Sequence, residues 1–206
     1  MKHKKNILIL AEGYEEKYYI EKIVNFPFIK DNYIFSPIIN LKGNGKILAR
    51  YQYEFQTNRH DLILVFADAD EGSNQFIEII EKLGLRIFGD ATKGKLVFMF
   101  VNPVTLQIVL SHFGDVKLLN KSKKENSKFV FDYTGIDNYD AKEEQIKEIT
   151  QKINTKNYYD MKSRISKLSD DYHIIPSTNI LCFLNRFENK DESWINDINK
   201  QIDYIK

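Results

Sequence analysis

The chain has 206 residues, of which 43% are hydrophobic and 29% are charged, and its formal net charge is +1. This composition excludes an intrinsically disordered chain, and the balanced charge excludes a global basic field of the kind that draws in nucleic acid. The single cysteine excludes an internal disulfide and a zinc site built from several cysteines. The apolar runs are too short for a signal-peptide core or a membrane span, so we expect a cytoplasmic protein without a membrane partner.

The first part of the chain alternates apolar strands with amphipathic helices. The predicted elements in chain order are a strand at 7–11, a helix at 15–25, a strand at 34–41, a helix at 47–55, a strand at 62–67, a helix that carries Phe76 to Leu83 and ends at Gly84, a strand at 95–101, and a helix with Pro103 in its first turn. This alternation predicts an α/β fold of the Rossmann-like class, with a mainly parallel four-stranded sheet flanked by helices.

The segment after Leu119 has a different character. Residues 120–128 are polar and basic, which predicts an exposed loop, and we expect three or four helices from Ala141 onward. We therefore predict an α/β core at residues 1–119 and a mainly helical C-terminal extension at residues 120–206, packed on the core.

Carboxylates follow two of the predicted strands. Glu12 comes after the first strand, and Asp68 and Asp70 come after the third. Because sites in parallel sheets form beyond the carboxyl ends of the strands, we expect these side chains to converge. If the backbone stays extended, Asp68 and Asp70 share a face, and two such carboxylates repel unless a cation lies between them. Mg²⁺ suits this site, and it would activate water for phosphodiester cleavage.

A simpler interpretation of the same residues is turn chemistry. Asp and Gly are ordinary residues after strands, and Asp70 or Ser73 is able to cap the following helix. The pattern alone leaves both interpretations open.

The two acidic motifs resemble the signature of the Toprim domain, which is found in topoisomerases, bacterial primases and several nucleases. The motif residues are Glu12-Gly13-Tyr14-Glu15-Glu16 after one strand and Asp68-Ala69-Asp70 after a later one. The resemblance implies a Toprim core that binds Mg²⁺ or Mn²⁺ through Glu12, Asp68 and Asp70. It also implies a second acid from the first motif, for which Glu15 and Glu16 are the candidates. Our predicted catalytic residues are Glu12, Asp68, Asp70 and Glu16. Glu71 is a further candidate metal ligand.

A later segment, Asn102-Pro103 followed by His112-Phe113, resembles a stretch of RloB-like proteins. These are small stand-alone Toprim proteins of bacterial defence loci, related to the OLD-type nucleases. The resemblance covers about residues 6–115. Two positions depart from the family pattern: Leu106 stands where RloB-like proteins usually have a glutamate, and Glu15 stands where many relatives have threonine.

Three residues are predicted to contact nucleic acid. Lys42 and Lys46 lie in a glycine-rich segment after the second strand, and they could contact a phosphodiester backbone, although a plain glycine turn explains them equally well. His112 could position a phosphate or transfer a proton, although a packed helical histidine is the commoner case. The basic run at 121–128 and the tyrosine pairs are weaker candidates for the same partner, as a solvated loop and half-buried core explain them.

We expect a Mg²⁺- or Mn²⁺-dependent Toprim nuclease that cleaves DNA or RNA, with tRNA among the candidate substrates. The resemblance implies a role in anti-phage defence and a partner ATPase. The helical C-terminus could form a homodimer surface, a substrate clamp or a lid on the sheet. One alternative is a catalytically weak Toprim module that binds nucleic acid or a partner ATPase, which the departure at Leu106 motivates. Another is a different Rossmann-like phosphotransfer enzyme acting on a small phosphorylated molecule.

Overall fold

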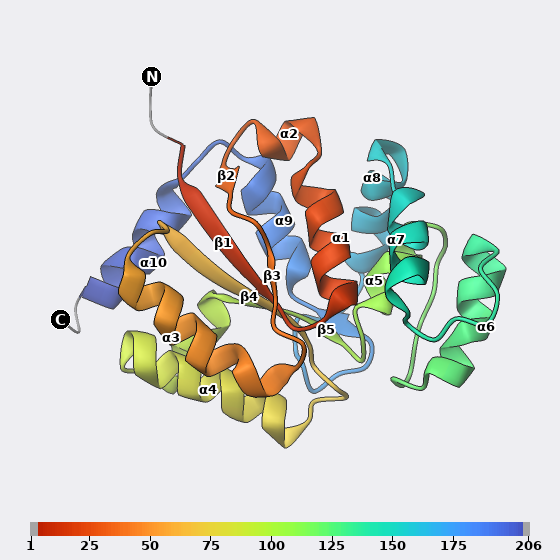
Figure 1. Ribbon diagram of the computed structural model, residues 1–206, viewed down its shortest axis with the longest axis horizontal. Coiled ribbons are helices and arrows are strands. Elements are labelled where there is room, and N and C mark those ends of the chain that lie inside the picture. Colours follow the sequence, from red (N-terminus) through yellow and green to blue (C-terminus); the bar gives the residue numbers. More distant parts are fainter. Residues whose placement is uncertain (1–3, 204–206) are drawn as a thin grey trace.

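The apolar runs of the sequence form the strands of one sheet in the computed structural model, which describes residues 4–203 (Figure 1). The strands are β1 (Asn6–Ala11), β2 (Ile34–Phe35), β3 (Ile39–Asn40), β4 (Leu62–Asp68), β5 (Phe98–Asn102) and β6 (Ser177–Thr178). The order across the sheet is β2-β1-β4-β5-β6, and β3 also pairs with β1. The β5–β6 pairing is antiparallel, whereas the other pairings are parallel. The predicted α/β class and mainly parallel sheet are therefore confirmed, in an arrangement consistent with a Rossmann-like fold.

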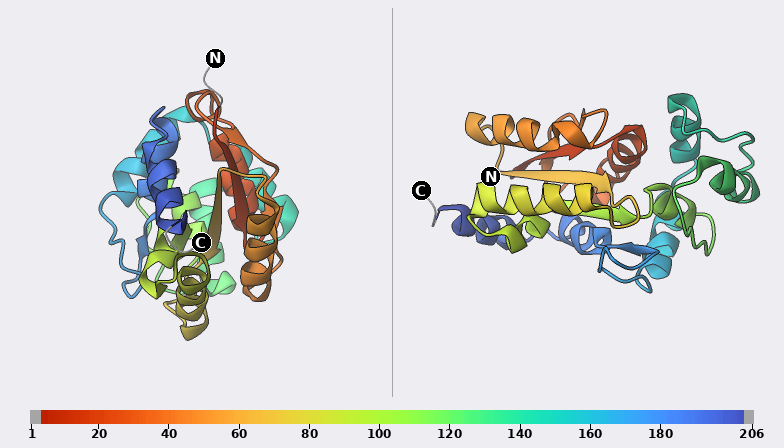
Figure 2. Two further views of the ribbon diagram at one scale, coloured as in Figure 1. Left: turned by 90° about the vertical axis from the view of Figure 1, so that its left-hand side faces the viewer. Right: turned by 90° about the horizontal axis from the view of Figure 1, so that it is seen from below.

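Helices cover both faces of this sheet. They are α1 (Tyr14–Val24), α2 (Pro27–Lys30), α3 (Ile47–Thr57), α4 (Asn74–Phe88), α5 (Leu106–Ser111), α6 (Lys123–Thr134), α7 (Glu143–Gln151), α8 (Thr155–Ile165), α9 (Ile180–Glu188) and α10 (Ser193–Asp203). Figure 2 shows α1 and α3 on one side of the sheet and α9 and α10 on the other, while α6, α7 and α8 gather at one end of the molecule. No helix within residues 4–203 is both long enough and apolar enough to cross a membrane.

Within residues 4–203, the sheet has six strands rather than the predicted four. The strand expected at 34–41 is divided into β2 and β3, because Pro37 lies between them and has no N–H to donate. The sixth strand, β6, comes from the C-terminal segment, where Ser177 and Thr178 pair with the end of β5. Only helices were predicted from Ala141 onward, and the helix that follows β6 begins at Ile180.

Two helices begin at positions that differ from the predictions. The helix after β5 begins at Leu106 rather than at Pro103, because the preceding Thr105 turns its backbone N–H and its hydroxyl toward Asp68. The predicted exposed loop at 120–128 is wrong from Lys123 onward, where α6 begins. The Ser122 hydroxyl accepts a hydrogen bond from the Glu125 N–H at 3.4 Å, so a Ser-x-x-Glu capping signal was overlooked.

Helix α4 continues past Gly84, where the sequence predicted its end, and stops at Gly89, which has φ of 66°. The lack of a side chain at Gly84 allows a close approach of the next segment. A Cβ atom there would lie 2.5 Å from the carbonyl oxygens of both Asp90 and Ala91. The glycine therefore serves packing between α4 and the 3₁₀ helix at Ala91–Leu96, and it does not terminate the helix.

Gly84→Ala is accordingly expected to destabilise the protein by about 1–3 kcal/mol, the usual cost of overpacking. The atoms in the way are backbone, so no side-chain rotation relieves the clash. Urea denaturation monitored by circular dichroism measures the change. Gly45→Ala is the matched control, because its Cβ would meet no atom within 4 Å; we expect a change within about 1 kcal/mol. Equal unfolding midpoints for the two variants would refute the packing role.

Candidate metal centre

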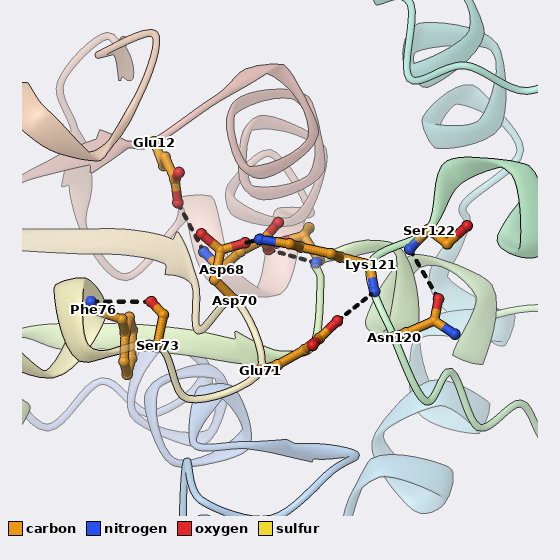
Figure 3. A network of polar contacts seen from close by, with 10 residues as sticks. Glu12, Asp68, Asp70, Glu71, Ser73, Phe76, Asn120, Lys121 and Ser122 are labelled. Carbon is orange, nitrogen blue, oxygen red and sulfur yellow. Dashed lines mark hydrogen bonds and ion pairs between the residues drawn. The ribbon is translucent and has the colours of Figure 1, made fainter.

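The ends of β1 and β4 bring two of the predicted carboxylates to the same edge of the sheet. These strands pair in parallel, with Ala11 beside Phe66, so the residues that follow also lie side by side. The Glu12 Oε2 atom accepts a hydrogen bond from the Asp68 N–H at 3.1 Å (Figure 3). The convergence of Glu12 with Asp68 therefore follows directly from the strand register.

The first turn of α1 adds two more carboxylates at this edge. Gly13 precedes the helix, and its N–H donates to Glu16 Oε2 at 2.8 Å, which is a capping contact that turns Glu16 back toward the end of β1. Glu15, Glu16 and Asp68 each offer an oxygen atom, and these three atoms all lie within 4.8 Å of one another. Glu15, Glu16 and Asp68 therefore present an all-oxygen ligand set of the kind that hard divalent cations prefer.

Two hydroxyl residues hold these carboxylates in place. Thr105, which is fully buried, donates to Asp68 Oδ1 from its N–H at 2.6 Å and from its hydroxyl at 2.8 Å. The Tyr139 hydroxyl donates a short hydrogen bond to Glu15 Oε1. Such supporting bonds fix the orientation of metal-binding carboxylates. Neither residue was predicted from the sequence, because each lies in a connecting segment far from the acidic motifs and carries no local pattern.

The carboxyl groups have raised pKa values because they are desolvated and close together. Burial raises the pKa of Glu12 to about 8, with further increases from the charges of Glu16 and Asp70. Burial and the neighbouring Glu16 raise the pKa of Glu15 to about 7. The pKa of Glu16 is raised by burial, and that of Asp68 lies well above its ordinary value because of burial and the charges of Glu16, Glu15 and Glu12. A cation bound among these carboxyl groups would lower their pKa values, since it favours the ionised form.

These carboxylates line a cavity of about 470 Å³ that also has a basic side. The lining includes the four acids together with Lys42, Lys121 and Lys123, and Leu106 and Tyr139 contribute apolar surface. Lys123 is the first residue of α6 and Lys121 lies two residues before it, so the segment after residue 119 contributes to the same cavity as the α/β core. A cavity with carboxylates and cations together suits a ligand that carries both a metal and a phosphate.

Asp70 and Glu71 lie differently from the prediction. Their φ angles are 50° and 64°, so the chain turns at Asp70 rather than remaining extended, and Asp68 and Asp70 do not share a strand face. Lys121 engages both residues: its Nζ lies 3.3 Å from Asp70 Oδ1, and its N–H donates to Glu71 Oε1 at 3.1 Å (Figure 3). Neither acid lines the cavity, although the charge of Asp70 is felt by Glu12.

His112 lies in the core, with 2% of its surface exposed. Its Nε2 lies 3.3 Å from the Tyr19 hydroxyl and its Nδ1 lies 3.3 Å from Asn157 Oδ1. Burial lowers the pKa of His112 to about 3, so the ring is neutral at physiological pH. This position leaves His112 without a surface for nucleic acid, and the packed-histidine alternative describes it better.

Only one of the two lysines predicted to contact nucleic acid lines the acidic cavity. Lys42 lines the acidic cavity, whereas Lys46 lines a neighbouring groove. The Asn102 side chain of the Asn-Pro motif is buried and donates to the carbonyl oxygens of Tyr172 and Ile174 at 2.8 and 3.0 Å. Asn102 therefore fastens the C-terminal segment to the end of β5 and does not reach the cavity.

Comparisons with known proteins found no family model, no curated protein and no solved structure that matches the chain. The Toprim resemblance therefore depends on the motif residues themselves. The fold and the site define an α/β protein with a candidate acidic metal centre beyond the carboxyl ends of β1 and β4.

Proposed function

We propose that this protein is a divalent-metal-dependent nuclease of the Toprim type, using Mg²⁺ or Mn²⁺. The observation that carries the proposal is the meeting of Glu15, Glu16 and Asp68 within 4.8 Å at a cavity that Glu12 also lines. The donor atoms are all carboxylate oxygens, which is the chemistry that Mg²⁺ and Mn²⁺ require. When bound, the metal would activate water and neutralise charge at a phosphodiester.

Other residues at the cavity would orient the metal ligands and bind the phosphate. Thr105 holds Asp68 in one orientation through two hydrogen bonds, so little reorganisation is needed on metal binding. Lys121 and Lys123 line the same cavity and would attract the phosphate and stabilise the negative charge that develops on it. Because Lys121 pairs with Asp70, phosphate binding would compete with that ion pair. These cationic groups favour a phosphodiester substrate.

Leu106 and Glu15 are the two departures from the RloB-like pattern. Taken together, they keep the number of carboxylates at the cavity unchanged. Leu106, which replaces the usual glutamate, lines the cavity. Glu15, which replaces the usual threonine, lines the same cavity, and the Leu106 backbone N–H partly offsets the effect of burial that raises the Glu15 pKa. We infer that position 15 supplies the carboxylate that is absent at position 106. This exchange argues against the catalytically weak binding module that Leu106 alone would suggest.

Glu15→Thr is therefore expected to weaken Mn²⁺ binding and cleavage by about 10- to 100-fold. Adding Leu106→Glu to this variant returns a carboxylate to the same part of the cavity, so most of the loss should be recovered. Leu106→Gln in the same background is the matched control, because it has the same size without the charge. Equal behaviour of the Glu and Gln double variants would contradict the exchange.

The nuclease proposal is tested by incubating the purified protein with labelled DNA and with total tRNA, in Mg²⁺, in Mn²⁺ and in chelator. Metal-dependent cleavage of either polymer is the expected result, and the polymer that is cut decides between DNA and RNA. A tRNA substrate would fit the defence role that the RloB-like resemblance implies. Hydrolysis of small phosphoesters without polymer cleavage would instead favour a phosphotransfer enzyme, and polymer binding without cleavage would favour a binding module.

A further inference from the structure

A second cavity, of about 440 Å³, adjoins the acidic one along the N-terminal end of α3. Asn40 and Lys42 line both cavities, so the two form one trough that leads away from the carboxylates. The rest of its polar surface comes from Lys46, Arg50 and Tyr53. We refer to this second cavity as the α3 groove.

The α3 groove is lined by three cations, of which Arg50 is paired with Glu54 at 2.6 Å. Lys42 and Lys46 are exposed, and within residues 4–203 no hydrogen bond or ion pair involves the Nζ atom of either. A 3₁₀ helix at Asn44–Lys46 leads directly into α3, and the Ile47 N–H donates to the Asn44 carbonyl. The free ammonium groups of Lys42 and Lys46 along one groove are suited to binding a phosphate backbone.

The α3 groove also contains buried polar atoms without partners. Asn40 Nδ2 and Arg50 Nε are both shielded from solvent and have no hydrogen-bond partner in the described chain. The Arg50 guanidinium is nevertheless held by Glu54, whose Oε1 lies 2.6 Å from Arg50 Nη2. Buried donors almost always have a partner, so Asn40 Nδ2 is an exception among the residues that line the groove.

Tyr53 gives the α3 groove an aromatic surface. Its side chain is 57% exposed, and the Arg50 guanidinium carbon lies 5.3 Å from the centre of the ring. An exposed ring supported by a guanidinium is a stacking surface for a base. An unpaired base offers its face in this way, whereas the internal bases of a duplex are stacked on each other.

We propose that the α3 groove binds a single-stranded segment of nucleic acid next to the phosphodiester in the acidic cavity, with one unpaired base stacked on Tyr53. This inference rests on the proposed nuclease function and assigns its substrate class. The groove is fixed relative to the carboxylates, because the Gly43 N–H donates to the Glu12 carbonyl at 2.9 Å and the Lys42 N–H donates to Asn40 Oδ1 at 2.8 Å. The strand would therefore run from Tyr53 past Lys46 and Lys42 to the metal centre.

The test is fluorescence anisotropy with labelled single strands of DNA and of RNA, and with a blunt duplex of the same sequence, in chelator so that cleavage cannot occur. We expect the single strands to bind at least about tenfold more tightly than the duplex, and Tyr53→Ala to weaken single-strand binding by about tenfold. Tyr53→Phe should retain the binding. Lys46→Ala should reduce the slope of log affinity against log salt by about 0.7.

Tyr159→Ala and Lys156→Ala are matched controls, because Tyr159 is 51% exposed and both residues lie on α8, away from α3 (Figure 1). Equal binding of single strand and duplex, or equal effects of Tyr53→Ala and Tyr159→Ala, would overturn the groove assignment. Tyr53-dependent binding without cleavage in any metal would refute the nuclease and leave the groove standing. Cleavage that Tyr53→Ala leaves unchanged, with no preference for single strands, would support the nuclease and refute the groove assignment.

Discussion

Asp68→Asn is expected to reduce metal-dependent cleavage by at least about 100-fold, because it removes a central metal ligand while keeping the shape of the side chain. The two hydrogen bonds from Thr105 end on Asp68 Oδ1, and the amide oxygen of asparagine can accept both. The loss would therefore reflect the missing charge rather than a displaced loop. A cleavage assay in Mg²⁺ and in Mn²⁺ measures it.

The same substitution should stabilise the protein in chelator at neutral pH. Burial and the neighbouring acids raise the pKa of Asp68 well above its ordinary value, so folding without metal must either protonate this group or bury its charge. Asparagine removes that cost, so the melting temperature should rise while activity falls. Asp160→Asn, at an exposed position on α8, is the matched control and should change neither quantity. Retained cleavage, or a melting temperature that falls, would exclude Asp68 from the proposed role.

The stability of the metal-free protein should decrease as the pH rises from about 5 to about 8. The pKa of Glu15 is raised to about 7 and that of Glu12 to about 8, both mainly by burial. The unfolded chain loses these protons near its ordinary carboxyl pKa, whereas the folded protein retains them to higher pH. The stabilisation is therefore fully present below the unfolded pKa and is lost as the pH rises through the folded values.

Excess Mg²⁺ should raise the melting temperature more at about pH 8 than at about pH 5, because metal binding requires the ionised carboxylates. His112 has the opposite pH dependence, since burial lowers its pKa to about 3 and its contribution is lost as the pH falls below the unfolded value. Comparing samples with and without Mg²⁺ at each pH cancels that contribution. A Mg²⁺ effect that is the same at every pH would show that these carboxylates do not bind the metal.

Much of the fold was predictable because its strands are apolar runs of the chain. The runs that form β1 and β4 are buried almost throughout, so neither could be mistaken for a surface segment. The meeting of Glu12 with Asp68 followed from the rule that parallel strands end at one edge. This rule locates only the residues that lie at the end of a strand or directly after it, such as Glu12 and Asp68.

The elements that the sequence did not predict depend on contacts distant along the chain. The strand β6 is only Ser177 and Thr178, and it exists because β5 offers an unpaired edge. Gly84 reads as a helix end until the close approach of Asp90 and Ala91 is known. Likewise, Tyr139 reaches Glu15 only through the packing of the C-terminal helices, and the turn at Asp70 depends on backbone conformation that the Asp-x-Asp spacing does not encode.

The most direct test of the central claim is a calorimetric titration of the protein with Mn²⁺ at neutral pH, in buffers of different ionisation enthalpy. The carboxylate centre predicts saturable binding with release of protons, at least about tenfold weaker in Asp68→Asn and unchanged in Asp160→Asn. Absence of saturable binding, or equal affinity in wild type and Asp68→Asn, would contradict a metal centre at Glu15, Glu16 and Asp68.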